Sequence, residues 1–178
     1  MSHTVHPYSH RLGILRDWKS RWFSPKGKFK EYLEADVVIR RYLEKKLKGF
    51  FIADIEIERS QKALRIILST SRPGMIIGRA GDGSQKLLAD VKKLLEKKKL
   101  LPAKVELKLD VKEVKSPESN AAIVAEMVVD GLEKRMPGRR VMKSMLEKVM
   151  ANRDVQGVRI FLAGRLGGAT MSRTEDRK

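Results

Sequence analysis

Cysteine is missing from the 178-residue sequence. Its absence excludes disulfide bonds, thiolate metal sites and thiol nucleophiles, and it fits a reducing compartment. Long apolar runs are missing too. None approaches the roughly 20 residues that a membrane-spanning helix needs, and the start of the chain, from Met1 to His10, holds no apolar signal core. We therefore expect a cytoplasmic protein that is neither exported nor embedded in a membrane.

Acidic and aromatic residues are scarce. Asp and Glu number 22 against 39 Lys and Arg, so the formal net charge is +17, and aromatic side chains make up 6% of the chain. Such an excess of positive charge points to a polyanionic partner. A hydrophobic fraction of 42% is typical of a folded protein, so the charge decorates a folded body. Because basic residues recur in every segment, one lipid-facing amphipathic helix does not explain them, and nucleic acid is the favoured partner.

Histidine occurs three times, at His3, His6 and His10. Imidazole groups can chelate a metal, but no carboxylate lies near these residues in sequence, and an irregular segment does not preorganise a site. The sequence also holds no acid cluster with metal-ligand spacing, which a nuclease would need. We therefore expect no metal, no cofactor and no catalytic triad, and a binding protein is favoured over an enzyme.

Hydrophobic periodicity predicts a first domain over residues 30–113, preceded by an irregular basic arm over residues 1–29. Apolar residues recur at three- and four-residue steps over 32–47, which indicates an amphipathic helix. Alternation of apolar and polar residues then predicts a hairpin with strands over 53–58 and 63–68.

A glycine-rich loop over residues 74–83 follows this hairpin and opens a second helix, whose apolar residues run from Leu87 to Leu95. Alternation over 105–112 predicts a third strand. With short helical turns beside the loop, the order of elements is αββααβ. The predicted fold class is α+β.

A second domain is predicted over residues 114–178. Ser116 precedes a proline and is the expected N-cap of a helix that runs to about Met136. Another helix is expected over 139–152, and a single strand over 158–162. Two helices and one strand make an α/β domain with a thin core and an unpaired strand edge.

The sequence Gly78-Arg79-Ala80-Gly81 matches the G-x-x-G pattern that holds the nucleotide backbone in K-homology domains. Glycine lacks a Cβ atom, so backbone N–H groups at a helix N-terminus can approach phosphates, while Arg79 adds a mobile positive charge. A Walker A loop would need lysine where Ser84 stands, and a dinucleotide fingerprint would need glycine where Lys86 stands. An ordinary glycine turn is the remaining alternative, and the flanking helix, hairpin and strand favour the nucleotide-binding loop over it.

Cations and aromatic side chains interleave in the arm between Arg16 and Phe23. This combination can neutralise phosphates and stack on bases. The alternative is that the aromatic side chains anchor the arm to the domain, and both interpretations can hold together. The candidate RNA-binding residues of the arm are Arg11, Arg16, Trp18, Arg21 and Trp22.

Three basic residues share one side of the helix predicted from residue 139. At about 100° per residue, Arg139, Arg140 and Lys143 fall within an arc of about 100°. The apolar stripe that contains Met142 lies on the opposite side. A solvated basic face is the usual interpretation of such a pattern, yet the stretch 134–146 holds five basic residues and no acid.

Several longer motifs make the chain similar to one family. They are His6-Pro7, Arg11 to Ile14, Trp18 to Phe23, Arg72 to Gly81, Gly157-Val158, Gly164 to Ala169 and Arg173 to Glu175. On these motifs the sequence resembles, over essentially its whole length, the family of the universal small-subunit ribosomal protein three in its bacterial form, which contains a type II K-homology domain. The Gly164-to-Ala169 motif belongs to the second domain of that family, and it adds Arg165 to the RNA-binding candidates.

The resemblance implies a place in the head of the small ribosomal subunit, where messenger RNA enters. It also implies contacts with small-subunit rRNA, with mRNA and with neighbouring ribosomal proteins, the tenth and the fourteenth. The family's role in unwinding structured messages is attributed to an Arg-Arg-x-x-Lys group, which falls here on Arg139, Arg140 and Lys143. No nucleotide hydrolysis is implied. The family continues beyond the position of Lys178 into further strands, which is why we expect a truncated second domain.

The function predicted from the sequence is that of a structural constituent of the small ribosomal subunit. The protein would bind rRNA, line the mRNA entry site and help to unwind structured mRNA. The alternative is a freestanding K-homology regulator that binds RNA outside the ribosome.

Overall fold

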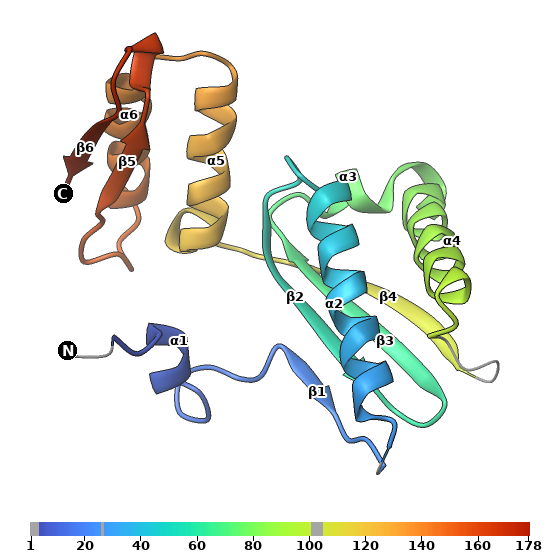
Figure 1. Ribbon diagram of the computed structural model, residues 1–178. Coiled ribbons are helices and arrows are strands. Elements are labelled where there is room, and N and C mark those ends of the chain that lie inside the picture. Colours follow the sequence, from blue (N-terminus) through green and yellow to red (C-terminus); the bar gives the residue numbers. More distant parts are fainter. Residues whose placement is uncertain (1–3, 26, 101–104) are drawn as a thin grey trace. The chain divides into compact units, whose positions relative to one another are not determined.

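The computed structural model describes residues 4–25, 27–100 and 105–178, which fall into two compact units (Figure 1). Of the described residues, one unit comprises those within 4–47, 54–68 and 74–112, and the other comprises residues 48–53, 69–73 and 113–178.

The first unit contains the predicted series of elements. In chain order these are α2 (Phe29–Lys46), β2 (Ile52–Arg59), β3 (Ala63–Thr70), α3 (Pro73–Ile77), α4 (Asp82–Lys97) and β4 (Glu106–Glu113). A hydrogen bond from the Ser60 amide to the Ala63 carbonyl, 2.8 Å long, closes the predicted hairpin. The order αββααβ is therefore confirmed.

The core of this unit forms where the helices cover one face of the sheet. Figure 1 shows α2 lying across the strands, with α4 beside it. Ile39 and Leu43 of α2 are fully buried, as are Leu64 and Ile66 of β3 and Leu95 of α4. Alternate residues of β2 and β3 thus point toward the helices, as the alternation predicts.

The arm is more regular than the sequence indicates. It contains the short helix α1 (Pro7–His10) and the strand β1 (Ser20–Trp22). β1 pairs in parallel with β2, and among the described residues the sheet has the strand order β1-β2-β3-β4. The prediction of an irregular arm is therefore wrong for these two segments. Three residues are too few for a periodic signal, and their strand conformation depends on the neighbouring edge of β2.

The second unit contains α5 (Ala121–Glu133), α6 (Gly138–Met150), β5 (Ile160–Gly164) and β6 (Arg173–Arg177). Its core cluster joins the two helices to β5 and is formed by Val128, Val141, Met142, Met145 and Ile160. Gly131 makes close packing possible, because a Cβ atom there would lie 3.1 Å from Met136 Cε and 3.2 Å from Val141 Cγ1.

Two predictions for this unit are wrong. The helix α5 does not begin at Ser116, because residues 117–119 form a 3₁₀ turn, and the side chain of Asn120 is the cap, accepting from the amides of Ala122 and Ile123 at 3.0 and 3.4 Å. The single predicted strand has a partner, since β6 pairs antiparallel with β5 over Ile160↔Arg177 to Gly164↔Arg173. All five residues of β6 are polar, so the strand carries no alternation that would reveal it.

Candidate nucleic-acid interface

The loop between α3 and α4 has an uncommon backbone. Gly78, Ala80 and Gly81 all have positive φ angles, at +73°, +51° and +83°. Glycine adopts this region freely, whereas an alanine there costs about 1–2 kcal/mol. A strained non-glycine residue in an exposed loop is characteristic of functional sites. The two glycines of the motif are therefore required by the turn, and the backbone beside Arg79 is left uncovered.

Gly83 is a further residue that this loop requires, although the sequence interpretation did not include it among the site residues. A Cβ atom at Gly83 would lie 2.6 Å from the carbonyl oxygen of Ile76 and 3.0 Å from that of Ile77. No real Cβ approaches backbone this closely, so glycine allows the first turn of α4 to contact the end of α3. Local spacing does not single it out, because Gly83 is predicted as the last residue of the glycine-rich loop, whereas in the structure it lies in the first turn of α4.

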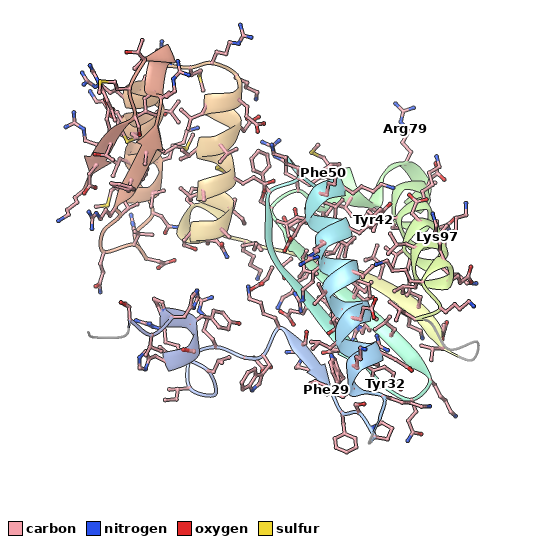
Figure 2. All side chains as sticks on the ribbon, in the orientation of Figure 1. Phe29, Tyr32, Tyr42, Phe50, Arg79 and Lys97 are labelled. Carbon is pink, nitrogen blue, oxygen red and sulfur yellow. The ribbon has the colours of Figure 1, made fainter. Side chains whose placement is uncertain are left out.

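The charged groups around the loop favour an anion. Arg79 is exposed, and Figure 2 shows its side chain pointing away from the ribbon. Asp82 would repel a phosphate, but its carboxylate pairs with Lys86 Nζ at 2.5 Å, one turn along α4. The Ser84 hydroxyl donates to the Gly81 carbonyl at 2.8 Å and holds the loop against the helix. The N-terminal end of α4 therefore carries an exposed cation and a neutralised acid.

The candidate residues of the arm divide into two groups. Arg21 faces acids, with its guanidinium nitrogens 2.7 Å from Asp17, 2.6 Å from Glu56 and 2.7 Å from Glu58. These carboxylates, led by the hydrogen bond with Asp17, raise the pKa of Arg21, and the same bond with Arg21 is the main cause that lowers the pKa of Asp17. The indole of Trp22 points inward and donates to Asp36 at 2.7 Å.

The other three arm residues face solvent. Arg11 and Arg16 are exposed, and the side chain of Trp18 is 61% exposed. Arg16 lies over the ring of Tyr8 at 5.6 Å, a cation–π contact within the arm. Arg21 and Trp22 thus anchor the arm to the first unit, whereas the other three residues of the same segment face solvent. A direct role of any of the five in RNA binding stays a prediction.

The basic group of α6 lies on the exposed side of that helix. Val141 and Met142 are buried at 1% and 0% exposure, which confirms the predicted apolar side, while Arg139, Arg140 and Lys143 are exposed. Arg139 Nε donates to Glu175 Oε1 of β6 at 2.8 Å. The group therefore contains one paired arginine beside two other exposed cations.

The position of these arginines at the helix N-terminus is unfavourable for the helix itself. The first turn of α6 has no acidic residue and no side-chain cap. Cations near a helix N-terminus oppose the helix dipole by about 0.3–1 kcal/mol each. Arg139 gains the pair with Glu175, but among the described residues Arg140 gains no ion pair that would offset this cost, and a local rule broken in this way is expected at a functional site. The helix dipole and the exposed cations together make this end of α6 suited to phosphate.

Arg165 lies in the turn between β5 and β6. Its Nε donates to the carbonyl oxygen of Ala169 at 2.8 Å, across a turn in which Gly164, Gly167 and Gly168 have positive φ angles. Arg165 therefore shapes the glycine-rich turn while its side chain remains exposed. Its contact with RNA stays a prediction.

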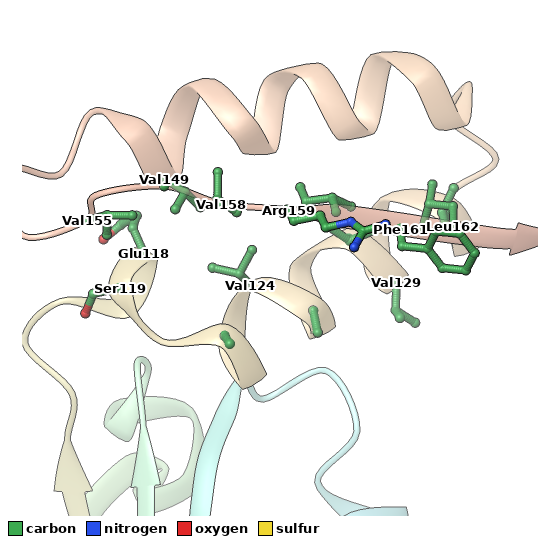
Figure 3. A pocket seen from close by; sticks show the side chains of 16 residues that line it. Glu118, Ser119, Val124, Val129, Val149, Val155, Val158, Arg159, Phe161 and Leu162 are labelled. Carbon is green, nitrogen blue, oxygen red and sulfur yellow. The ribbon is translucent and has the colours of Figure 1, made fainter. Parts of the chain in front are cut away.

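The second unit also contains an apolar groove of about 450 Å³ between α5 and β5 (Figure 3). Most of its lining is aliphatic, including Val124 and Val129 of α5 and Leu162 of β5, and the charged side chains at it are Glu118 and Arg159. Such a lining suits another apolar surface rather than phosphate. Periodicity did not predict it, because a helix that is apolar on several sides does not show which side stays uncovered.

Within residues 4–25, 27–100 and 105–178, no three His, Cys, Asp or Glu side chains gather as they would around a metal ion. His3 lies outside the described residues. In the same part of the chain, no helix has the length and apolar character needed to cross a bilayer.

Comparison with known proteins covers both units. A KH domain model matches residues 38–119, and a model of the C-terminal domain of ribosomal protein S3 matches residues 128–178. The chain is 41% identical over 98% of its length to the small ribosomal subunit protein uS3 of Caldicellulosiruptor bescii, and it covers 75% of that relative. The corresponding protein of Agathobacter rectalis is 41% identical over the same share, with 76% of its length covered, and that of Clostridium perfringens is 38% identical, with 75% covered.

Proposed function

Since the chain belongs to the uS3 family of small ribosomal subunit proteins, we propose that it holds rRNA in the small subunit through the Gly78–Gly81 loop and the arm. The observation that carries this proposal is the backbone of the loop, in which three positive φ angles surround an exposed Arg79 at the N-terminal end of α4. This geometry presents the N-terminal end of a helix and one exposed cation to a phosphate. The role is structural and needs no catalytic step or cofactor.

A double substitution of the loop tests this proposal. Arg79→Asp with Ala80→Asp reverses the charge of the loop without disturbing its backbone, because aspartate tolerates a positive φ better than alanine does. We expect weaker crosslinking to small-subunit rRNA and an unchanged circular dichroism spectrum. Arg79→Ala with Ala80→Asn is the matched control that keeps the backbone preference without adding acids, and it should show a smaller loss. Native crosslinking by the double aspartate variant would mean that the loop is only a turn.

A second role, contact with incoming mRNA, is favoured by α6. Two arginines at an uncapped helix N-terminus weaken the helix but suit a phosphate chain, and Lys143 lies one turn further along the same side. We propose that Arg139, Arg140 and Lys143 line the mRNA entry path and help to split duplexes. The cations would hold separated strands by their phosphates, while translocation by the ribosome supplies the energy.

The partners proposed at this place are small-subunit rRNA, mRNA and the tenth and fourteenth ribosomal proteins of the small subunit. We also propose the domain limits 1–29, 30–113 and 114–178, which limited proteolysis would test.

A freestanding K-homology regulator is the competing role. Sedimentation in high salt distinguishes the two, because a ribosomal constituent travels with the small subunit and a regulator does not.

A further inference from the structure

Within the first unit, the arm is held against α2 and β2 by two polar side chains of α2, the buried Asp36 and the half-buried Arg40. Asp36 is 3% exposed, and its Oδ2 accepts the indole N–H of Trp22 at 2.7 Å. Within the described residues, its other oxygen, Oδ1, has no hydrogen bond and lies 3.8 Å from Arg59 Nη2. A buried carboxylate needs donors to offset its lost hydration. The Trp22 indole supplies one.

Arg40 is one helical turn after Asp36 and also reaches the arm. Its Nη2 donates to the Lys19 carbonyl at 2.8 Å and to the Ser20 hydroxyl at 2.9 Å, while Nη1 donates to the carbonyl of Ile55 in β2. One guanidinium therefore joins the arm to the strand beside it. Although the protein has a high net positive charge, these three hydrogen bonds of Arg40 are all made to atoms of its own chain.

The ring of Trp22 completes the attachment. It lies 5.5 Å from the Phe29 ring and 5.9 Å from that of Tyr32, and Figure 2 shows these two side chains at the start of α2 beside β1. Beyond this anchor, toward the N-terminus, lie the exposed Arg16 and Trp18. β1 thus joins Trp22, whose ring packs beside α2, to the exposed residues Arg16 and Trp18 that precede it in the chain.

We propose that Asp36 and Arg40 are positioning residues that dock the arm on the edge of the sheet, so that Arg11, Arg16 and Trp18 meet RNA from a fixed place. This inference rests on the RNA contact proposed above for the arm. We call the contacts of Asp36 and Arg40 with the arm the dock. It reduces the conformational freedom that a loose arm would lose on binding RNA. It acts through Trp22, whose indole donates to Asp36, and through Ser20, whose hydroxyl accepts from Arg40.

Amide exchange measures the dock directly, without RNA. The Ile57 amide donates to the Lys19 carbonyl at 2.9 Å, so it is protected when the arm is bound to β2. Trp22→Phe keeps a ring against Phe29 but removes the donor to Asp36, and loss of a hydrogen bond to a charged group should speed Ile57 exchange about tenfold. Ser20→Ala, which removes one acceptor of Arg40, should have a smaller effect in the same direction.

Two internal controls separate docking from folding. Trp18→Phe makes the same chemical change at an exposed indole and should leave Ile57 exchange as in the parent. The Glu106 amide, which donates to the Lys62 carbonyl on the other side of the sheet at 2.8 Å, should stay protected in every variant. Unchanged exchange at Ile57 in Trp22→Phe overturns the dock.

Positioning is tested by coupling between the dock and the arm. Binding of a fluorescent single-stranded RNA of mixed sequence is measured with and without Arg11→Ala and Arg16→Ala, in the parent and in Trp22→Phe. The arginine pair should cost several-fold in affinity in the parent and less in Trp22→Phe, since a released arm no longer places it. An equal cost in both backgrounds overturns positioning. No cost in the parent instead refutes the proposed RNA contact of the arm, while the exchange result still decides whether the dock exists.

Discussion

Arg139 Nε and Glu175 Oε1 lie 2.8 Å apart, so one arginine of the proposed mRNA-contacting group is paired with a carboxylate of β6. The side chain of Arg139 is 78% exposed, and pairs this exposed are worth about 0.2–1 kcal/mol. The pair therefore holds Arg139 loosely, while the negative charge of Glu175 weakens the local attraction for phosphate.

This pairing predicts unequal contributions within the group. Arg139→Ala should reduce affinity for a single-stranded RNA less than Arg140→Ala does. Glu175→Gln should raise affinity by at most about fivefold, the equivalent of one exposed ion pair. Asp176→Asn removes the same charge one residue away, where the carboxylate pairs with Arg159, and should raise affinity less. Equal effects of the two acid substitutions would show that only net charge matters.

RNA binding by the isolated protein should be largely electrostatic, because the net charge is +17 and aromatic residues are few. Log affinity should fall linearly with log salt concentration. Arg79→Ala should reduce the magnitude of the slope by about 0.7, the value for one phosphate contact on a single strand. Arg65→Ala also removes one positive charge, but from a side chain that pairs with Asp110 and Glu58, so the slope should not change. An affinity that barely responds to salt would contradict phosphate contact.

Gly83 and Gly74 provide a matched pair for the loop. Gly83→Ala forces a Cβ against the carbonyl oxygen of Ile76 and should destabilise the protein by about 1–3 kcal/mol, as overpacking does. Gly74→Ala adds a Cβ with nothing within 4 Å, inside helix α3, and should be neutral or stabilise by up to about 1 kcal/mol. Urea unfolding measures both. A Gly83→Ala variant as stable as Gly74→Ala would show that the α3–α4 contact is not needed.

These residues also show how far the sequence determines the fold and the site. Alternation of buried and exposed residues predicts β2 and β3, because one side of each strand packs against helices. It does not predict β1 or β6, whose conformation follows from pairing with a neighbouring strand rather than from their own side chains. The pattern of apolar and polar side chains therefore indicates which residues are buried, but it does not indicate which strands pair with one another.

The site shows the same division. The glycines at positions 78 and 81 and the basic side of α6 follow from local spacing. In the structure Gly78 and the basic side of α6 are exposed, and Gly81 is half-buried. The inward role of Trp22 depends on Asp36, which lies 14 residues away and whose burial a charged residue type argues against. Local spacing does not reveal tertiary partners of this kind, so the anchor and the exposed residues of the arm could not be separated beforehand.

The proposed unwinding role makes a prediction about messages of different structure. Replacing Arg139, Arg140 and Lys143 by alanine removes exposed cations from a helix whose buried side is untouched, so the fold and subunit assembly should be kept. Elongation on an unstructured template should be near normal. Elongation through a stable hairpin placed just downstream of the entry site should slow, because separated strands are no longer held by their phosphates.

The control for this experiment is a second triple variant with the same change in charge. Lys92, Lys93 and Lys97 are exposed on α4 of the first unit, and their replacement by alanine should slow both templates alike or neither. Elongation is measured on matched templates that differ only in the hairpin, with ribosomes carrying each variant. If the α6 variant slows both templates equally, the unwinding role is wrong. If this variant is lost from assembled subunits, the three residues are rRNA anchors, since removing their charge then disrupts assembly rather than the passage of mRNA.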